Sequence, residues 1–361
     1  MHSCQIMIIG YPSHAMTSRL HEEMRDRGHR SLLVHPDRVV THVADGAVTV
    51  LPEVGSLDAV VLTTSTDQVT ALHSAAQLQH VGIPVLNSPT ATLRAADKIM
   101  TTVELARAGI PVPRTVSVGS LDTAMAGADL IGYPLVLKAA DGAEGNQTRQ
   151  VPSAEHLPEV FRELRASMGQ RSSSRTPLLL QEQLQRALGR DRRLFVVGGR
   201  VQAAMDRVAR PGEWRSNLSQ GATPLPAEAT TEEIDIAERT AVALGLDFTT
   251  VDLMAGDRGP VVIEANAFGD VLDVAMTSGL DLIGSLADLV EVRAGARPVG
   301  RISPKHLHRG AHAALSAMCR RRLADKRAEL QQSTPAEETA PTRVVTAAAA
   351  PDALRRRSTP T

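Results

Sequence analysis

The sequence of 361 residues is poor in aromatic residues and in cysteine. Aromatic residues make up 2% of it, which argues against a nucleic-acid surface built on base stacking. Cys4 and Cys319 lie at opposite ends and fit neither a disulfide framework nor a metal motif, so we expect a reducing, cytoplasmic environment. No apolar run approaches the roughly 20 residues that span a bilayer, and the start, MHSCQIMIIGYP, lacks the features of a signal peptide. We expect no membrane partner and no specific nucleic-acid partner.

The charge is unevenly distributed, although the net charge is only −1. Residues 301–361 contain twelve Lys and Arg against five Asp and Glu, a net of +7, which leaves −8 for the first 300 residues. The sequence becomes low in complexity at the end, so we predict a helix at Ala311–Leu330 and disorder from about Gln331. The basic tail is either a solvated terminus or a tether for an acidic partner.

The first 90 residues alternate between apolar runs and helical patterns, which predicts a parallel, doubly wound sheet. The segment GYPSHA after the first apolar run lacks the G-x-G-x-x-G pattern, so a dinucleotide site is not expected there. We expect strands at Gln5–Gly10, Ser31–His35 and Ala59–Thr64 and a helix at Gln68–His80.

From Ala91 onward the pattern changes to a mixed order of helices and strands. The stretch ATLRAADKIMTTVELARAG predicts one helix that ends at Gly109. A Gly-Gly pair in LFVVGGRVQAAM predicts a β-hairpin. Further elements are expected as helices at Leu121–Ala128, Ala154–Met168 and Glu233–Leu244 and as strands at Tyr133–Ala140 and Leu178–Leu184.

Polar side chains end an apolar run near residue 264. Glu264 and Asn266 follow Val261–Ile263 and point to the same face, because a strand sends residues i and i+2 to one side. If the run that holds Asp252 is the antiparallel neighbour, three side-chain oxygens meet at one edge of a sheet. Carboxylate and amide oxygens suit Mg²⁺ held together with phosphates. The alternative is a hairpin whose polar ends are exposed to water.

Basic and glycine-rich segments suggest a phosphate ligand. Lys138 follows a buried-looking run, an unfavourable place for an ammonium group without an anion. The loop Asp141–Gly145 could close backbone N–H groups over a phosphate, and Arg210, Arg215 and Asn217 lie on a second loop. Taken singly, the loop could be a plain turn and Lys98 a surface lysine. Together with the predicted metal ligands, these residues favour a nucleoside triphosphate.

The order of these segments resembles that of the ATP-grasp ligases, and within them the RimK-type glutamate ligases. The resemblance runs from about Leu86 to Val292 and rests on ADKIMTTVELARAGIPVPRT, YPLVLKAADGAEG, LLLQEQLQRALGRDRRLFVVGGRVQAAMDR, GEWRSNLSQGA and VDLM…VVIEANAFGD. It implies an α/β fold, with α+β lobes: a Rossmann-like pre-ATP-grasp domain at 1–90, a small lobe at 91–177, a C-terminal lobe with the metal site at 178–297 and a basic tail at 298–361.

The resemblance also implies roles for individual residues. The nucleotide ligands would be Lys98, Lys138, Asp141, Gly142, Gly145, Glu182, Gln183, Leu184, Asp191, Arg215, Ser216 and Asn217. Both lysines would contact the α- and β-phosphates, and residues 182–184 would line the adenine through backbone groups. Arg207, Arg215 and Asn217 would stabilise the acyl intermediate. Asp252, Glu264 and Asn266 would bind two Mg²⁺ ions, for which Mn²⁺ could substitute, with Glu264 bridging.

The sequence departs from the family after the predicted metal strand. The RimK pattern there is roughly N-x-S-P-G, whereas this chain has Asn266-Ala267-Phe268-Gly269-Asp270 on the acceptor side. The implied chemistry is ATP-dependent ligation of a carboxylate to an amine. Three functions follow: addition of an amino acid such as glutamate to a peptide, carrier protein or metabolite; formation of side-chain amide or ester links in a natural-product precursor peptide; or nucleotide binding without turnover. A homo-oligomer is compatible with all three.

Overall fold

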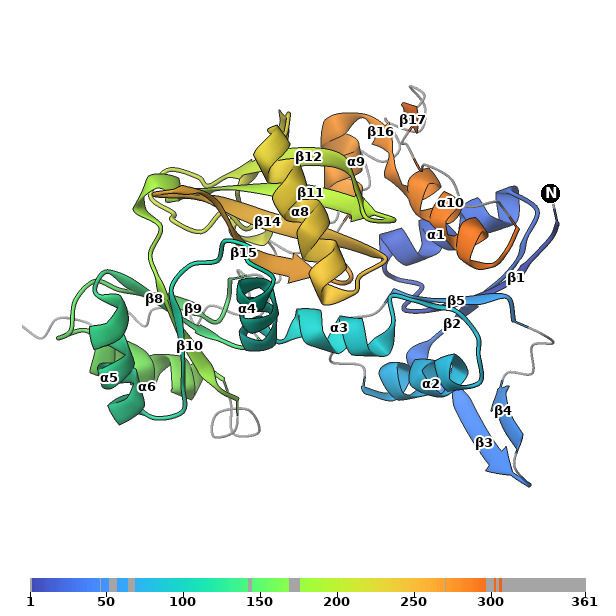
Figure 1. Ribbon diagram of the computed structural model, residues 1–361, viewed down its shortest axis with the longest axis horizontal. Helices are drawn as coiled ribbons and strands as arrows, with labels where there is room; N and C mark the ends of the chain where they lie inside the picture. Colours follow the sequence, from blue (N-terminus) through green and yellow to red (C-terminus); the bar gives the residue numbers. More distant parts are fainter. Residues whose placement is uncertain are drawn as a thin grey trace, which may run out of the picture.

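The structure is a computed structural model whose three larger β-sheets are arranged in a row (Figure 1). It describes residues 2–45, 47–51, 57–63, 69–141, 145–168, 176–269, 271–296, 302 and 305–306. The predicted phosphate ligand Gly142, the predicted helix Ala311–Leu330 and the predicted disordered tail lie outside the described residues.

The N-terminal sheet is parallel, as the alternation of strands and helices predicted, with the order β2-β1-β5-β6. Its helices cover opposite faces, because Met16 and Leu20 of the first helix pack with Ile6 and Ile8 whereas the second helix packs on the other side of the sheet. The elements are β1 (Gln5–Ile9), α1 (Ala15–Asp26), β2 (Arg30–Val34), β5 (Ala59–Leu62), α2 (Val69–His80) and β6 (Val85–Leu86).

A β-hairpin that was not predicted projects from this first unit (Figure 1). It follows η1 (Pro36–Arg38) and pairs β3 (Val40–Ala44) with β4 (Ala47–Leu51). Its signal was present in the sequence, because an Asp-Gly pair between alternating apolar residues is typical of a tight hairpin turn. Asp45 adopts a left-handed φ of 51°, which such turns require.

Two helices, and not the single helix that we predicted, connect the N-terminal sheet to the rest of the chain. They are α3 (Pro89–Ala96) and α4 (Lys98–Arg107). Asp97 separates them as an N-cap: its Oδ1 accepts hydrogen bonds from the backbone N–H groups of Ile99 at 2.8 Å and Met100 at 3.1 Å. This break places Lys98 in the first turn of a new helix.

A four-stranded antiparallel sheet of order β7-β10-β8-β9 forms the second unit. Its strands are β7 (Thr115–Val118), β8 (Leu135–Ala139), β9 (Thr148–Val151) and β10 (Leu178–Glu182), and α5 (Leu121–Ile131) and α6 (Leu157–Ser167) supply side chains to its core. Leu135 and Leu137 of β8 are buried in that core, so the alternation of the strand sends Lys138 to the opposite face.

The third unit is a five-stranded antiparallel sheet of order β13-β12-β11-β14-β15. The predicted hairpin is present, and Gly198 and Gly199 form its turn with φ values of 57° and 73°. The strands are β11 (Arg190–Val197), β12 (Arg200–Val208), β13 (Thr223–Ala227), β14 (Phe248–Gly256) and β15 (Gly259–Asn266), with η2 (Gln185–Ala187) and η3 (Leu218–Gln220) in the connections.

Helices cover this sheet unequally on its two faces. The helix α8 (Thr231–Leu244) packs on one face, against Leu194 and Val196 of β11. On the other face, α9 (Val271–Ser278) and α10 (Leu282–Arg293) share a core with Phe195 and Val197 and with the N-terminal sheet. Two short strands, β16 (Leu280–Asp281) and β17 (Lys305–His306), pair beside these helices.

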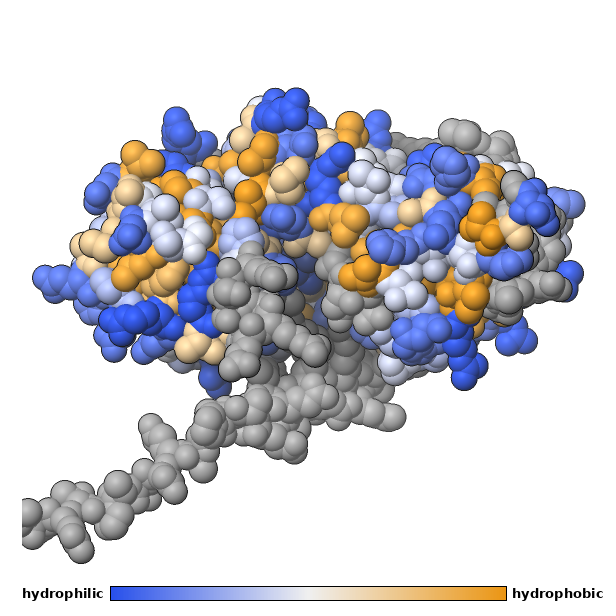
Figure 2. Space-filling model, turned by 90° about the horizontal axis from the view of Figure 1, so that it is seen from below, coloured by the Kyte–Doolittle hydropathy of each residue, from blue (hydrophilic) through white to orange (hydrophobic). Residues whose placement is uncertain are grey.

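Polar contacts fix the N-terminal unit to the rest of the molecule. Arg27 pairs with Asp288 of α10 at 2.7 Å, and His29 Nε2 lies 3.1 Å from Glu291 Oε1. Apolar and polar side chains are interspersed on the face drawn in Figure 2, as is usual for protein surfaces. Among the described residues, no helix combines the length and apolarity that crossing a membrane requires.

Candidate active site

A pocket between the antiparallel four-stranded sheet (β7-β10-β8-β9) and the five-stranded sheet brings most of the predicted site residues together. From the predicted set it is lined by Lys98, Lys138, Gly145, Glu182, Gln183, Leu184, Asp191, Arg207, Arg215, Ser216, Asn217, Asp252 and Glu264. Asp141 does not line it and instead accepts a long hydrogen bond of 3.4 Å from Thr176. Asn266 does not line it either, although it ends the strand that carries Glu264.

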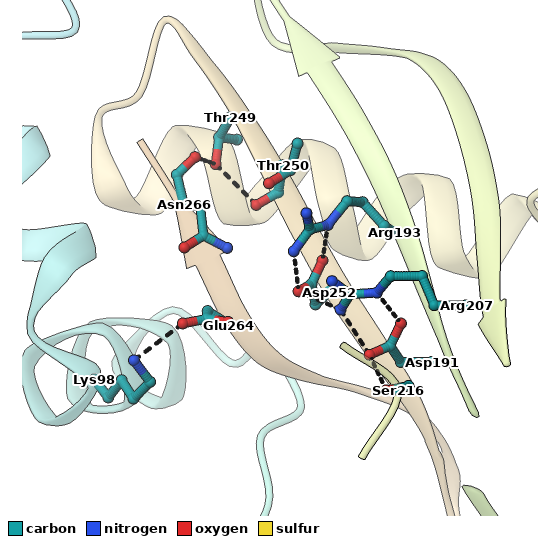
Figure 3. A network of polar contacts seen from close by, with 10 residues as sticks. All are labelled: Lys98, Asp191, Arg193, Arg207, Ser216, Thr249, Thr250, Asp252, Glu264 and Asn266. Atoms are coloured by element: carbon teal, nitrogen blue, oxygen red, sulfur yellow. Dashed lines mark hydrogen bonds and ion pairs between the residues drawn. The ribbon is translucent and has the colours of Figure 1, made fainter. Parts of the chain in front are cut away.

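The predicted metal ligands lie on neighbouring antiparallel strands, as the sequence predicted. Asp252 of β14 is directly opposite Glu264 of β15, and Asn266 is opposite Thr250 (Figure 3). The alternative of a hairpin with water-exposed polar ends is wrong for Asp252, since that residue is only 1% exposed.

Glu264 is paired with the first predicted phosphate lysine. Lys98 Nζ lies 3.0 Å from Glu264 Oε1 (Figure 3). Burial by itself would raise the pKa of Glu264, but the positive charge of Lys98 is close enough to lower it below its ordinary value. The backbone N–H of Lys98 also donates to the carbonyl oxygen of Ala140, which follows β8. The helix α4 therefore links the predicted metal strand to the small sheet.

Asp252 is held between two arginines that approach it from opposite sides (Figure 3). Arg193 donates from Nε to Oδ1 and from Nη2 to Oδ2, both at 2.7 Å, and Arg207 Nη2 donates to Oδ2 at 2.7 Å. Burial raises the pKa of Asp252, but the two guanidinium groups outweigh this effect and bring it to about 2. Asp252 is therefore ionised throughout the neutral pH range.

Arg207 has a second carboxylate partner. Its Nε and Nη2 atoms donate to the two oxygens of Asp191 at 2.6 Å each, and Ser216 Oγ donates to Asp191 Oδ2 at 2.5 Å. Asp191 is 4% exposed, and burial raises its pKa although Arg207 opposes the shift. This bidentate pair fixes the guanidinium of Arg207 in one orientation.

Lys138 lies on the opposite side of the pocket and donates from Nζ to Gln181 Oε1 at 2.6 Å. Gln181 in turn donates to Thr115 Oγ1 at 2.9 Å, which fixes its amide orientation. Burial, together with the nearby charge of Lys98, lowers the pKa of Lys138 to about 8. An ammonium group whose charge is so poorly compensated is suited to bind a polyphosphate.

The second predicted phosphate loop contacts the glycine loop directly. Arg215 Nη1 donates to the carbonyl oxygen of Gly145 at 3.2 Å, and its guanidinium also pairs with Glu213 at 2.9 Å. Gly145 has a φ of 72°, and a Cβ atom there would lie 2.6 Å from Asn217 Oδ1. Glycine is therefore required at this position on both conformational and steric grounds.

The adenine end of the pocket was only partly predicted. Glu182 turns its carboxylate away toward Arg114, whose backbone N–H and Nε donate to it at 2.9 and 2.8 Å, so only its backbone remains to face a base. Lining residues that sequence reasoning missed are Val136, Thr148, Gln181, Leu188, Trp214, Met254 and Ile263. Trp214 is the single tryptophan of the sequence and directly precedes the RSN segment, and this position is the sequence signal that could have identified it as a lining residue.

The donor atoms fit a hard divalent cation. Asp252 and Glu264 provide carboxylate oxygens and Asn266 an amide oxygen, the ligand types that Mg²⁺ accepts beside phosphates. In the described part of the chain, no group of three or more His, Cys, Asp and Glu side chains could hold a metal ion, so a metal at this position would depend on the amide oxygen of Asn266 as well as on the two carboxylates. Positive side chains, Lys98 and the two arginines, neutralise the carboxylates in this structure.

The segment that departs from the family pattern lies against the N-terminal unit. Phe268 stacks on His14, at the start of α1, with ring centroids 5.4 Å apart. Gly269 approaches β14 so closely that a Cβ atom would lie 1.9 Å from Thr250 Oγ1, and that buried hydroxyl has no hydrogen-bond partner among the described residues. The segment after β15 therefore packs against the residues between β1 and α1, which lie at the carboxyl end of the parallel strands, where such sheets commonly bind ligands.

Residues 95–290 match the family model described as the RimK-like ATP-grasp domain. The chain belongs to the RimK-like ATP-grasp family. As a member, it is an enzyme of the ATP-grasp ligase class, whose products include ADP. The match covers the described sheets that form the pocket and ends within α10.

Two curated relatives of this family are glutamate ligases by name. The chain is 38% identical over 223 residues to a probable alpha-L-glutamate ligase of Serratia proteamaculans (strain 568), covering 60% of this chain and 70% of the relative. It is 36% identical over 221 residues to the ribosomal protein bS6–L-glutamate ligase of Shigella boydii serotype 4 (strain Sb227), with the same two coverages.

Solved structures share the fold at lower identity. The ATP-grasp ligase PsnB in complex with a minimal precursor superposes with a TM-score of 0.63, at 22% identity, over 80% of this chain and 98% of PsnB. PsnB with minimal precursor, Mg and ADP superposes with a TM-score of 0.62, at the same identity and coverages. At this identity the likeness establishes the ATP-grasp fold of the chain.

Proposed function

We propose that this protein is an ATP-dependent carboxylate–amine ligase that adds an amino acid such as glutamate to a peptide, carrier protein or small metabolite. The observation that carries the proposal is the facing pair Asp252 and Glu264, with Lys98 and Lys138 in the same pocket. This is the arrangement that a Mg²⁺–triphosphate complex needs, since it offers carboxylates to the metal and cations to the phosphates.

The proposed reaction has two steps. A carboxylate of the acceptor attacks the γ-phosphate of ATP, which gives an acyl phosphate and ADP. An amine then attacks the carbonyl carbon, the amide bond forms and phosphate leaves. In this scheme the protein orients the reactants and offsets the negative charge that accumulates during phosphoryl transfer.

Each part of the pocket has a proposed role in that scheme. Lys98 and Lys138 contact the α- and β-phosphates, and the backbone of Glu182–Leu184 holds the adenine beside the apolar side chains of the pocket. Asp191 and Ser216 keep Arg207 directed toward the reacting phosphate, and Arg215 and Asn217 close over it together with the glycine loop. Asp141 and Gly142 are also proposed to contact the nucleotide.

Asp252, Glu264 and Asn266 would hold two Mg²⁺ ions or their Mn²⁺ substitutes, with Glu264 between them. Divalent cations at this position neutralise the phosphates and polarise the γ-phosphoryl group. Lys98 is in contact with Glu264, so its ammonium group can offset the negative charge of that carboxylate.

The acceptor is proposed to be a peptide or protein carboxylate. The Shigella relative is named for glutamate ligation to ribosomal protein bS6, which supports glutamate as the donor. A second candidate, ligation within a precursor peptide, is favoured by Phe268, which replaces the small polar residue of the RimK pattern and stacks on His14. Loss of turnover is disfavoured, since both lysines, Asp252 and Glu264 line the pocket and Asn266 follows Glu264 on the same strand.

We further propose that the chain divides into a Rossmann-like pre-ATP-grasp domain at 1–90, a small lobe at 91–177, a metal-binding lobe at 178–297 and a basic extension at 298–361. The parallel order β2-β1-β5-β6 supports the first of these. A cytoplasmic location is proposed because the sequence has only two cysteines, far apart along the chain.

The function can be tested with a screen for acceptor-dependent ADP formation. The purified protein is incubated with Mg²⁺–ATP, L-glutamate and a panel of acids, including peptides that end in Glu. Parallel reactions contain hydroxylamine in place of glutamate, which traps an acyl phosphate as a hydroxamate. We expect ADP and hydroxamate to form in equal amounts with an accepted acid.

The Glu264→Gln variant serves as the inactive control in this screen. ADP formation by the wild type that never yields hydroxamate or amide, with any acid, would overturn the ligase proposal. A product that contains glutamate identifies the first candidate, whereas an intramolecular link in a peptide without added amino acid identifies the second.

A further inference from the structure

Arg193 differs from Arg207 in how it is compensated, although both bind Asp252. Arg207 makes two hydrogen bonds to Asp191 besides its one to Asp252, whereas the two hydrogen bonds of Arg193 both go to Asp252. The side chain of Arg193 is only 11% exposed. Its pairing therefore depends on the carboxylate that is also a proposed metal ligand.

The charges of the pocket leave a positive excess. Outside the Arg215–Glu213 and Arg114–Glu182 pairs, the charged side chains that line the pocket are Lys98, Lys138 and Arg207 against Asp191, Asp252 and Glu264, and Arg193 adds a positive charge through its contact with Asp252. ATP with two divalent cations adds no net charge to this set. One positive charge thus remains after the nucleotide and metal have bound, and one carboxylate from the acceptor would neutralise it.

The positive charge that remains uncompensated is that of Arg193. A cation bound by Asp252 would compete with Arg193 for the carboxylate that accepts both its hydrogen bonds, whereas Arg207 would keep Asp191. A nearly buried guanidinium without a partner is strongly unfavourable, so another anion must take the place of Asp252. Arg193 offers two parallel N–H donors, the geometry that a carboxylate accepts.

We propose that Arg193 forms the binding subsite for the carboxylate of the acceptor, and that this subsite opens when Asp252 is engaged by the metal. The inference rests on the proposed function and specifies how the enzyme selects its acceptor carboxylate. The ligand is a carboxylate with at least one oxygen free to reach the γ-phosphate. In the structure without ligands, Asp252 fills this subsite as an internal carboxylate.

The position of Arg193 agrees with this role. Arg193 lies on the side of Asp252 that faces Thr250 and Asn266, whereas Arg207 lies on the side of Asp191 and Ser216 (Figure 3). The next residue of β11 on the same face, Phe195, is already part of the core under α9. Arg193 is therefore the last charged group of this strand before the segment that bounds the acceptor side.

Two consequences can be measured. Arg193 and the metal compete for Asp252, so the metal binds more weakly than it would without Arg193. A carboxylate that occupies Arg193 removes this competition, and by thermodynamic reciprocity metal and carboxylate each increase the affinity of the other. The acceptor should then bind after the nucleotide and metal.

The first experiment needs no acceptor. Mn²⁺ is titrated into the protein with saturating ADP, and binding is followed by the free Mn²⁺ signal in electron paramagnetic resonance and by the fluorescence of Trp214. We expect Arg193→Gln to bind Mn²⁺ about fivefold or more tightly than the wild type. Weaker Mn²⁺ binding by Arg193→Gln would overturn the proposal, because it would mean that Arg193 only holds Asp252 in place.

Arg192 provides a matched control. It is adjacent to Arg193 in sequence but pairs with Asp206 and with Glu233 of α8, on the other face of β11. Arg192→Gln should leave Mn²⁺ affinity unchanged even if it lowers the melting temperature. Thermal melts of both variants establish that the protein is folded, which is expected for Arg193→Gln since Asp252 retains its bond to Arg207.

The second experiment uses an acid that supports hydroxamate formation in the screen. Arg193→Gln should raise KM for that acid about tenfold or more, with KM for ATP unchanged, and Arg193→Lys should restore part of the loss. Equal KM values for the acid in Arg193→Gln and the wild type would overturn the subsite. If no acid is accepted by the wild type, the proposed function fails, while the Mn²⁺ titration still decides whether Arg193 competes for Asp252.

Discussion

The ammonium group of Lys98 and the carboxylate of Glu264 are 3.0 Å apart, although the two residues belong to a linking helix and to the edge strand of the five-stranded sheet. This contact joins the residue proposed for the α/β-phosphates to the residue proposed to lie between two metal ions. Changing the carboxylate to an amide removes charge without changing size, so Glu264 is the sharpest point at which to test the site.

Glu264→Gln should reduce ADP formation to below about a tenth of wild type, because an amide cannot offset the charge of divalent cations. Nucleotide binding should persist, since both lysines and the apolar lining remain. The measurements are coupled-assay turnover and the thermal shift on adding ATP. Glu232→Gln, an exposed glutamate on α8, is the control and should be fully active. Retention of most activity in Glu264→Gln would rule out the metal assignment.

Lys138 should make ATP binding dependent on pH. Its pKa of about 8 means that the ammonium form, which binds phosphate, is lost as pH rises through 8. ATP affinity should therefore fall between pH 7 and 9, and binding near pH 8 should take up protons. Calorimetry in buffers of different ionisation enthalpy measures that uptake. Lys138→Met should bind ATP about tenfold or more weakly at pH 7 and lose the pH dependence; an unchanged pH profile would contradict the role.

The same group affects stability in the protein without ligands. Because folding lowers the pKa of Lys138 from 10.5 to about 8, the unfolded chain binds more protons than the folded one between these values. The unfavourable contribution of Lys138 to the free energy of folding is fully present below pH 8 and disappears as pH rises toward 10.5. Urea unfolding at pH 7 and pH 9 should show a smaller gap between wild type and Lys138→Met at the higher pH.

Asp191→Asn should destabilise the protein markedly. The residue forms a bidentate pair with Arg207, and both side chains are at most 5% exposed. Removing one partner of a buried pair costs on the order of 3 kcal/mol, partly offset here by the bond of Arg207 to Asp252. Asp235→Asn, which breaks the exposed pair with Arg239, should cost less than about 1 kcal/mol. Equal midpoints of urea unfolding for the two variants would contradict this prediction.

Asn87 makes four hydrogen bonds, three to the start of β14 and one to the segment that follows β15. Its Nδ2 donates to the carbonyl oxygens of Phe248 and Ala267 at 2.8 and 2.7 Å, and its Oδ1 accepts from the backbone N–H groups of Asp247 and Phe248. Asn87→Ala leaves these buried groups without partners and should cost about 2 kcal/mol or more.

Asn87→Asp should be no less destabilising than Asn87→Ala at pH 7, since it places a carboxylate oxygen against two carbonyl oxygens. Chemical denaturation of both variants beside the wild type tests this. An aspartate variant as stable as the wild type would show that the donors of Asn87 contribute little.

Local patterns in the sequence were sufficient for much of the site. The period of two along VVIEAN predicted that Glu264 and Asn266 share a face, and the strand pairing bears this out. The same period explains Lys138, which lies on the face of β8 opposite the buried leucines. The Gly-Gly turn fixed the pairing of β11 with β12. In each case the information is contained within one or two adjacent elements.

What the sequence did not reveal depends on pairs that are distant along the chain. Arg193 reaches Asp252 only because β11 and β14 are neighbours, although a long segment separates them in sequence. The break at Asp97 was missed because apolar periodicity continues across it, and the capping bonds outweigh helix continuation there. The β3–β4 hairpin had a clear Asp-Gly signal that was overlooked.

The strand β11 carries charged site residues on one face and structural contacts on the other. Asp191 and Arg193 face the pocket, whereas Arg192 pairs with Glu233 of α8 and Leu194 packs beneath that helix. In a saturation mutational scan of these consecutive residues, the effects of substitution would therefore alternate between two classes from one position to the next. Substitutions at Arg193 would abolish growth that depends on catalysis while protein abundance persists, those at Asp191 would reduce growth and abundance together, and those at the even-numbered positions would reduce abundance first.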